Sequence, residues 1–406
     1  MAKRPPSDRR AFLRSLANDG AATAGSLLGA IGAIRGGAEV ISADLHAATR
    51  ELGADPVRRR AAETDLDLPS DIGLSAAGDA NPEPAYASPL RDEDGAVIVL
   101  DIRALPAAIV ERRATSANSI AALLAVDAIA PGPIRALAAA FALTLASAGS
   151  TTGRAARLQA AAAALRNAAP LSTSLHAELD ALLPIALAGD GLDAAIATRA
   201  ARQLGERSAY GERIATALRG IGSASGTTIA SGPGLGATAW GDLAPAHEAL
   251  RHLGVRTFAI AAGPTVDVCG TTRLGAIDAA DAVRAGLAPT LLEDGQLASQ
   301  IAHPDGPIGA LILGSDAISS DGYAALPVGS AGLAAAALFS GVPVLLVAGS
   351  AAVDLTAADL VKRIELVNRA AESRGATVAA RGVASGVRTV SPRVELLALD
   401  GITLIN

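Results

Sequence analysis

The sequence has 406 residues, a formal net charge of −6 at pH 7, 50% apolar residues and only 2% aromatic residues. This length allows two domains with separate cores, and those cores must be built from Ala, Val, Leu and Ile. The mild negative charge argues against nonspecific binding to nucleic acid. A single cysteine, Cys269, rules out an internal disulfide and a cysteine-based zinc site. The five histidines include no pair four residues apart, so we predict no metal site.

Residues 1–92 are expected to form an N-terminal extension that is helical at first and then becomes a linker. The pair Arg9-Arg10, followed by the apolar run 21–34, resembles a twin-arginine export signal. The run is too short to span a bilayer, and no small-x-small cleavage site follows it. An amphipathic helix is the alternative interpretation of this segment. We therefore predict a cytoplasmic protein without stable membrane insertion, and we keep export as the alternative.

Residues 93–222 are expected to form a smaller, mostly helical domain with a short β-hairpin. The segment "AVIVLDIRALPAAIVERRA" predicts two short strands that are joined by a turn near Pro106. From Ser116 to about Arg219 the apolar residues recur with helical spacing, and prolines mark the breaks between helices.

Residues 223–406 are expected to form a Rossmann-like α/β domain with a doubly wound parallel sheet. Short apolar runs alternate there with helix-length segments, and strands that are apolar on both faces are typical of a parallel sheet. In such sheets ligands bind beyond the carboxyl ends of the strands. The predicted strands are residues 227–231, 257–262, 288–293, 308–313 and 342–349.

The glycine-rich loop after the first of these strands is a candidate anion site. Gly232, Gly234 and Gly236 lie between a predicted strand and a predicted helix, where backbone N–H groups can approach an anion. The spacing also fits the loose dinucleotide-binding pattern, but the next predicted strand ends without the acidic residue that would hold a ribose. A dinucleotide site is therefore disfavoured. A sugar-phosphate cradle and a simple glycine-rich turn both remain open.

Asp316 is a candidate functional carboxylate because it follows the carboxyl end of the predicted strand 308–313. The alternative is an aspartate that only accepts hydrogen bonds from backbone N–H groups in a turn. The residues by themselves leave both interpretations open.

The segment that begins at Gly314-Ser315-Asp316 resembles a signature of a known family. This family contains methylthioribose-1-phosphate isomerase, ribose-1,5-bisphosphate isomerase and the alpha, beta and delta subunits of eukaryotic translation initiation factor 2B. Shorter blocks also resemble it, among them "TTRLGA" with Arg273, "TLLEDGQLA" with Asp294 and the isomerase-like "VLDIRALP". The resemblance covers about residue 96 to the C-terminus. The other signature features that keep order and spacing are Asp321-Gly322, Gly329-Ser330 and Gly341-Val342-Pro343.

The resemblance implies a sugar-phosphate aldose–ketose isomerase with an altered substrate or weakened activity. Asp316 falls on the family's acid/base aspartate, and Ser231 falls on its catalytic cysteine. A serine hydroxyl is a poorer acid or base than a thiol unless it is activated. The family's phosphate-contacting arginine falls on Ala130, with Arg135 five residues further on, and its Asn-Lys pair falls on Leu326-Pro327. The substrate-binding residues that the resemblance implies are Gly232, Gly234, Gly236, Arg273, Asp294, Gly329 and Ser330.

The same resemblance implies no cofactor, a homodimer, and a small phosphorylated sugar or nucleotide as the ligand. The isomerase interpretation includes a role in methionine salvage. The alternative is a catalytically inactive homologue of the initiation factor 2B subunits, which binds a nucleotide or sugar phosphate and acts in regulation or assembly. The joint loss of the cysteine, the arginine and the Asn-Lys pair motivates this alternative.

Overall fold

A computed structural model of the chain describes most of the residues after position 88. The expected N-terminal extension, with its Arg9-Arg10 motif, lies outside the described residues, apart from a two-residue strand at 73–74. The described ranges are 73–74, 89–106, 108–148, 151–220, 228–233, 244–255, 257–263, 273–303, 306–315, 317–349, 353–379 and 392–405.

The predicted hairpin is present within a small sheet of order β1-β4-β3-β2. Strand β3 is buried along its whole length, as its apolar sequence AVIVL requires. It pairs antiparallel with β2 on one side and with β4 on the other. The strands are β1 (Gly73–Leu74), β2 (Leu90–Glu93), β3 (Ala96–Leu100) and β4 (Glu111–Ala114).

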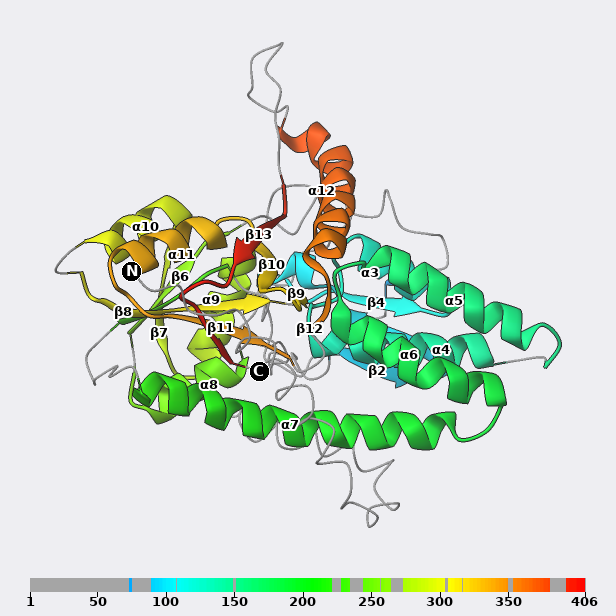
Figure 1. Cartoon of the computed structure of the whole chain (residues 1–406). Coiled ribbons are helices and arrows are strands. Elements are labelled where there is room, and N and C mark those ends of the chain that lie inside the picture. Colours follow the sequence, from blue (N-terminus) through cyan, green and yellow to red (C-terminus); the bar gives the residue numbers. More distant parts are fainter. Residues whose placement is uncertain are drawn as a thin grey trace.

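Five helices follow, and together we call them the helical region. Helix α4 begins with Pro133 at its first position, where a proline costs no hydrogen bond. Buried leucines and alanines fill the core between these helices, which explains how the region folds with so few aromatic residues. The long α7 packs against α4 and α6 at one end and against α8 (Ala244–His252) at the other, so it links the two halves (Figure 1). The helices are α3 (Ala117–Ala125), α4 (Pro133–Ser147), α5 (Arg154–Ala168), α6 (Thr173–Ala188) and α7 (Leu192–Gly220).

The C-terminal half contains a six-stranded sheet of order β14-β11-β8-β5-β6-β7. Every neighbouring pair in this sheet is parallel. Parallel neighbours cannot be joined by a tight turn, so the chain has to cross over the sheet between them. The connecting helices therefore lie on the faces of the sheet. The strands are β5 (Thr228–Ser231), β6 (Thr257–Ala261), β7 (Ala288–Leu292), β8 (Ile308–Ser315), β11 (Val344–Ala348) and β14 (Thr403–Ile405).

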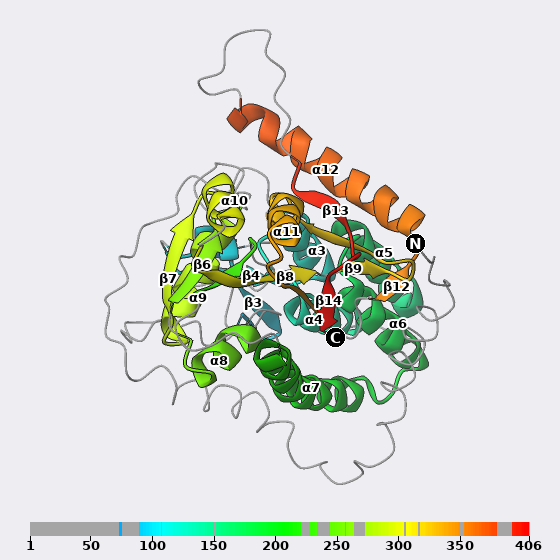
Figure 2. The ribbon, with the colours of Figure 1, turned by 60° about the vertical axis from the view of Figure 1, so that its left-hand side comes forward.

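Helices cover both faces of this sheet, as the prediction of a doubly wound fold requires. One face packs against α7, α8 and α9 (Leu274–Arg284) through residues such as Ile229 and Ile312. The other face packs against α10 (Asp294–Ala302) and α11 (Ser330–Phe339) through residues such as Ala230 and Leu313. Figure 2 shows these layers. Successive side chains of a strand point to opposite faces of the sheet, so residues on both faces must be apolar when helices cover both. The predicted α/β fold is confirmed.

A second four-stranded sheet, of order β12-β9-β10-β13, was not predicted from the sequence. Its strands have only three to five residues, which is too short for a recurring pattern of apolar residues to reveal them in the sequence. Helix α12 (Ala357–Ala379) packs on it. The strands are β9 (Ala317–Ser319), β10 (Tyr323–Pro327), β12 (Val353–Leu355) and β13 (Val394–Ala398).

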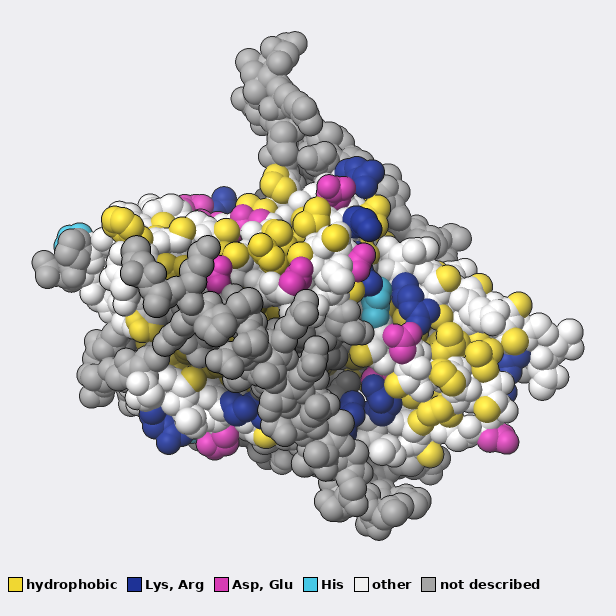
Figure 3. All heavy atoms as spheres, viewed as in Figure 1, with side chains coloured by type: hydrophobic (Ala, Val, Ile, Leu, Met, Phe, Trp, Pro, Cys, Tyr) yellow, Lys and Arg dark blue, Asp and Glu magenta, His cyan; other side chains and the backbone are white. Residues whose placement is uncertain are grey.

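The surface agrees with the mild net charge. On the face shown in Figure 3, the blue and magenta side chains of the described residues are interspersed, and they form no extended basic patch there. None of the described helices is long and apolar enough to cross a membrane.

Gly275 allows helix α9 to pack directly on strand β6. A Cβ atom at this position would overlap the carbonyl oxygen of Ala261 and lie 2.9 Å from the Cα atom of Ala262. We expect Gly275→Ala to lower the free energy of unfolding by about 1–3 kcal/mol, measured by urea denaturation. Gly332→Ala is the control, because no atom lies within 4 Å of the added Cβ at that position. Equal effects of the two substitutions would contradict this prediction.

Candidate functional site

The carboxyl ends of the parallel strands bring together residues that lie far apart in the sequence. We call this edge the carboxyl edge; β5 ends there at Ser231 and β8 at Ser315. The backbone N–H of Gly263, just after β6, donates a 2.9 Å hydrogen bond to Oδ1 of Asp294. Gly329 also lies against Asp294, since a Cβ atom there would come within 3.0 Å of its Cγ atom. Asp294 thus fixes the loops that follow three different strands.

Two buried serine hydroxyls lie at this edge on either side of Gly232. Ser231 is 0% exposed and Ser330 is 1% exposed. Neither Oγ atom has a hydrogen-bond partner among the residues that the structure describes. A Cβ atom on Gly232 would come 2.5 Å from the Leu313 Cδ2 atom and 3.6 Å from the Ser330 Oγ atom, so the backbone of Gly232 lies close to both side chains. Buried hydroxyls are nearly always hydrogen-bonded, which makes these two candidates for ligand contact.

A carboxylate already occupies the N-terminus of helix α11. The backbone N–H of Ala331 donates a 2.6 Å hydrogen bond to Oε1 of Glu395. Burial raises the pKa of Glu395 and the nearby Asp294 adds to the rise, while the N–H groups of Ala331 and Gly329 oppose it. No sequence motif marks Glu395, because this residue reaches helix α11 from the distant strand β13.

Arg273 lies at the N-terminus of α9 and is engaged at the surface. Its Nη1 atom forms a 2.5 Å ion pair with Oε2 of Glu293, and both side chains are largely exposed. Glu293 in turn caps helix α10 together with Gln296. The predicted substrate-binding residues Arg273 and Asp294 therefore lie on neighbouring loops of one edge.

Three predicted site residues, Gly234, Gly236 and Asp316, lie outside the described residues. Ser315, which precedes Asp316, is buried, and its Oγ atom lies 2.9 Å from the carbonyl oxygen of Ala317 and 2.8 Å from that of Ala325, so its one proton can be donated to either of them. This hydroxyl fastens the end of β8 to strand β10.

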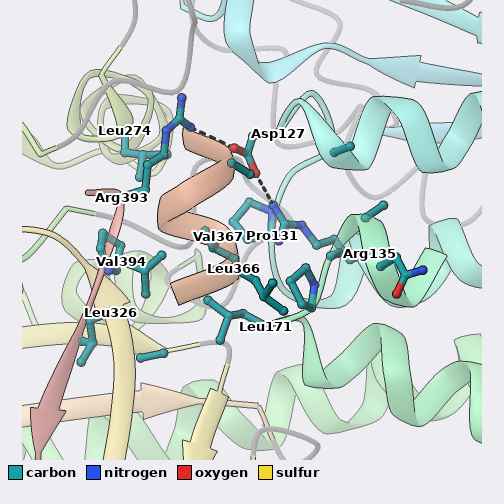
Figure 4. A pocket seen from close by; sticks show the side chains of 18 of the residues that line it. Asp127, Pro131, Arg135, Leu171, Leu274, Leu326, Leu366, Val367, Arg393 and Val394 are labelled. Carbon is teal, nitrogen blue, oxygen red and sulfur yellow. Dashed lines mark hydrogen bonds and ion pairs between the residues drawn. The ribbon is translucent and has the colours of Figure 1, made fainter. Parts of the chain in front are cut away.

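A cavity of about 460 Å³ lies between the helical region and the segments that follow the carboxyl edge. Leu326 and Pro327, which stand at the positions of the family's Asn-Lys pair, form part of its wall. Figure 4 shows that the wall is mainly apolar and that helix α12 contributes Leu366 and Val367 to it. The replacement noted in the sequence therefore makes one side of this cavity apolar.

Three charged residues line the cavity within the described part of the chain. Arg135 Nη2 lies 3.3 Å from Oδ1 of Asp127, and Arg393 Nη1 lies 2.9 Å from Oδ2 of the same carboxylate (Figure 4). In the sequence, Arg135 stands five residues after the position of the family's arginine, and Asp127 and Arg393 belong to no recognisable motif. No local sequence signal identifies this trio, since 266 positions separate Asp127 from Arg393.

Solved structures match this chain, whereas the two sequence comparisons find no match. The sequence matches no protein-family model and no curated protein. Among solved structures, the 5-methylthioribose 1-phosphate isomerase of Pyrococcus horikoshii OT3 matches with a TM-score of 0.59 and 18% identity, over 78% of this chain and 90% of the other. The delta subunit of translation initiation factor eIF-2B from A. fulgidus matches with a TM-score of 0.57 and 20% identity, over 78% and 94%.

The chain has the fold of these two proteins. The translation initiation factor eIF-2B of Pyrococcus horikoshii OT3 also matches, with a TM-score of 0.51 and 14% identity over 71% of this chain and 94% of that one. These structural neighbours are an isomerase and initiation-factor proteins, the same kinds of protein that the sequence resembles. The family resemblance predicted from the sequence is therefore confirmed at the level of the fold. Because a fold hosts more than one function, the activity must be argued from the site.

Proposed function

We propose that the protein binds a phosphorylated sugar at the carboxyl edge and interconverts its aldose and ketose forms. The observation that carries this proposal is the pair of buried serine hydroxyls, Ser231 and Ser330, without partners in the described part of the structure. They flank Gly232 at the edge where ligands bind in parallel α/β sheets. The fold shared with an isomerase of a sugar phosphate supports the same assignment.

In this proposal Asp316 is the acid/base group and Ser231 is the second catalytic group. The aldose 1-phosphate ring opens, and a hydrogen moves from C2 to C1, which gives the ketose. A carboxylate enclosed with its substrate suits this proton transfer, because desolvation favours its neutral form. The residues that we propose to contact the substrate are Gly232, Gly234, Gly236, Arg273, Asp294, Gly329 and Ser330.

The test is ketose formation followed by NMR with methylthioribose 1-phosphate and ribose 1,5-bisphosphate as substrates. We expect a ketose from one of them, and a rate that falls roughly 10²–10⁴-fold in Asp316→Asn, the range for loss of general acid–base catalysis. Ser340→Ala, at an exposed position after α11, is the control and should leave the rate unchanged. Absence of ketose from both substrates, or full activity in Asp316→Asn, would refute the isomerase proposal.

A second candidate function is ligand binding without turnover, in regulation or assembly. The observation in its favour is that the Ser231 side chain is fully buried and that no described side chain hydrogen-bonds to its hydroxyl to activate it. A sugar phosphate or nucleotide monophosphate that raises the melting temperature without forming product would support this candidate. A melting temperature unchanged by all of them would count against it.

The proposal also includes a homodimer that works in the cytoplasm. Light scattering of the purified protein should then give twice the chain mass of 40.1 kDa. A mass of one chain at micromolar concentration would contradict this part of the proposal.

A further inference from the structure

We propose that His176 and Arg363 form an acid-sensitive latch between the helical region and helix α12. His176 lies near the start of α6, and Arg363 lies on α12 in the C-terminal half. The Nη1 atom of Arg363 donates a 2.8 Å hydrogen bond to the carbonyl oxygen of Pro170 and lies 3.3 Å from the Nδ1 atom of His176. The latch therefore joins two parts of the chain that are 187 positions apart.

The hydrogen bonds of the His176 ring require its uncharged form. The Nε2 atom lies 3.2 Å from the carbonyl oxygen of Ala169, which can only accept, so Nε2 carries the proton of the neutral ring. The guanidinium of Arg363 can only donate, so Nδ1 must offer it a lone pair. A second proton on the ring would be bound at Nδ1 and would point at the guanidinium. Protonation thus replaces a hydrogen bond by repulsion between two cations.

The groups around His176 make the latched ring difficult to protonate. Burial lowers the pKa of His176 below its ordinary value of 6.5, and the guanidinium groups of Arg363 and Arg166 act in the same direction. The Ala169 carbonyl and the Asp180 carboxylate oppose this shift. Asp180 is itself paired with Arg166 at 2.5 Å and is 70% exposed, so solvent screens its effect on the ring.

Acid favours the open form of the latch. When the latch opens, water reaches the His176 ring and its pKa returns toward 6.5, so the open form binds a proton more readily than the latched form. The stabilisation of the latched form is complete above pH 6.5. It is lost as the pH falls through the lowered pKa of the latched ring.

Helix α12 is also held by an apolar contact that does not titrate. Its residues Leu360 and Ile364 pack against the second four-stranded sheet, and Leu171 of the helical region joins the same cluster. Protonation of the latch therefore loosens the helical region from α12 and leaves α12 bound to its own sheet.

The latch connects two sides of the cavity of about 460 Å³. Residues 169–171 of the helical region line this cavity, and so do Leu366 and Val367 of α12 (Figure 4). Release of the latch frees these two sides to move apart. Acid therefore loosens the boundary between the two halves at this cavity, which goes beyond the proposed isomerase activity.

Hydrogen–deuterium exchange of the full-length protein at pH 7.5 and 5.5, corrected for the intrinsic exchange rate at each pH, tests this proposal. We expect the protection of segments 169–176 and 357–370 to fall roughly three- to tenfold on acidification, relative to the protection of helix α4. Helix α4 belongs to the core of the helical region and reports unfolding of the whole region. Equal loss of protection in all three segments would overturn the proposal.

Two substitutions assign the pH effect to the latch. His176→Asn offers Arg363 an amide oxygen and cannot take up a proton, so the additional loss of protection at pH 5.5 should disappear. Arg363→Met keeps an apolar stem and removes the donor, so the low protection should already be present at pH 7.5. A full pH effect in His176→Asn, or unchanged protection at pH 7.5 in Arg363→Met, would overturn the proposal.

His252→Gln and Arg369→Gln are the matched controls. His252 is an exposed histidine of α8, and Arg369 is an arginine of α12 that is 70% exposed. Both variants should keep the pH effect of the natural sequence, and its loss in either of them would show that it does not arise at the latch. The result of the isomerase assay leaves this test untouched, since no substrate is involved.

Discussion

Replacing Asp101 by Asn is expected to lower the free energy of unfolding by about 3–5 kcal/mol, the usual effect of removing one partner from a buried ion pair. Asp101 follows strand β3 and is 2% exposed. Its Oδ2 atom accepts hydrogen bonds from Arg103 Nη2 at 2.6 Å and from Arg112 Nε at 3.2 Å, and Oδ1 accepts from Arg103 Nε at 2.8 Å. The substitution takes the shared carboxylate away from two buried guanidinium groups.

Urea denaturation followed by circular dichroism measures this loss. Asp180→Asn is the matched control: it also removes an arginine partner, but Asp180 is 70% exposed, so the expected loss is at most about 1 kcal/mol. If both variants unfold at the same urea concentration, the buried cluster contributes no more than a surface ion pair, and the prediction is wrong.

The protein should lose about 3 kcal/mol of stability on acidification because of His247 alone. This side chain of helix α8 is 2% exposed and makes an edge-on contact with the ring of Phe258. Burial lowers the pKa of His247 from 6.5 to about 4, and the guanidinium of Arg284 acts in the same direction. The unfolded chain therefore binds a proton between these pH values that the folded chain does not. The stabilisation is complete above pH 6.5 and is lost as the pH falls toward 4.

The measurement is the free energy of unfolding at several pH values between 7 and 4.5, for the natural sequence and for His247→Leu. We expect a flatter pH dependence in the variant, whatever its stability at pH 7. His252→Gln is the control, because His252 lies on the same helix and is exposed. An unchanged pH dependence in His247→Leu would show that buried carboxylates and not this imidazole set the acid limit.

The parallel sheet was predictable because its strands are buried on both faces. The predicted strands 257–262 and 308–313 are observed as β6 (Thr257–Ala261) and β8 (Ile308–Ser315). Burial on two faces requires a continuous apolar run, and such a run is visible in a single sequence. Strand β10 was missed because its stability comes from pairing with β13, in which Tyr323 faces Ala398. No local pattern records a partner that lies so far along the chain.

Some residues of the candidate site could be predicted from the sequence, and others could not. The parallel topology by itself predicts that Ser231, Asp294 and Gly329 approach one edge, and the structure places Asp294 against Gly329 and Ser231 beside Gly232. The pairing of Glu395 with the N-terminus of α11 depends instead on a distant strand that runs past this helix.

The sequence by itself determined the helical spacing, the apolar strands and therefore the α/β fold, because these features follow from the burial of neighbouring residues. Only the tertiary structure decided which charges meet. Asp127 and Arg135 belong to the helical region, whereas Arg393 lies just before strand β13. The packing of the helical region against the C-terminal half brings Arg393 to Asp127. An ion pair needs a separation of a few ångströms, and only the folded chain sets that separation for residues that are far apart in sequence.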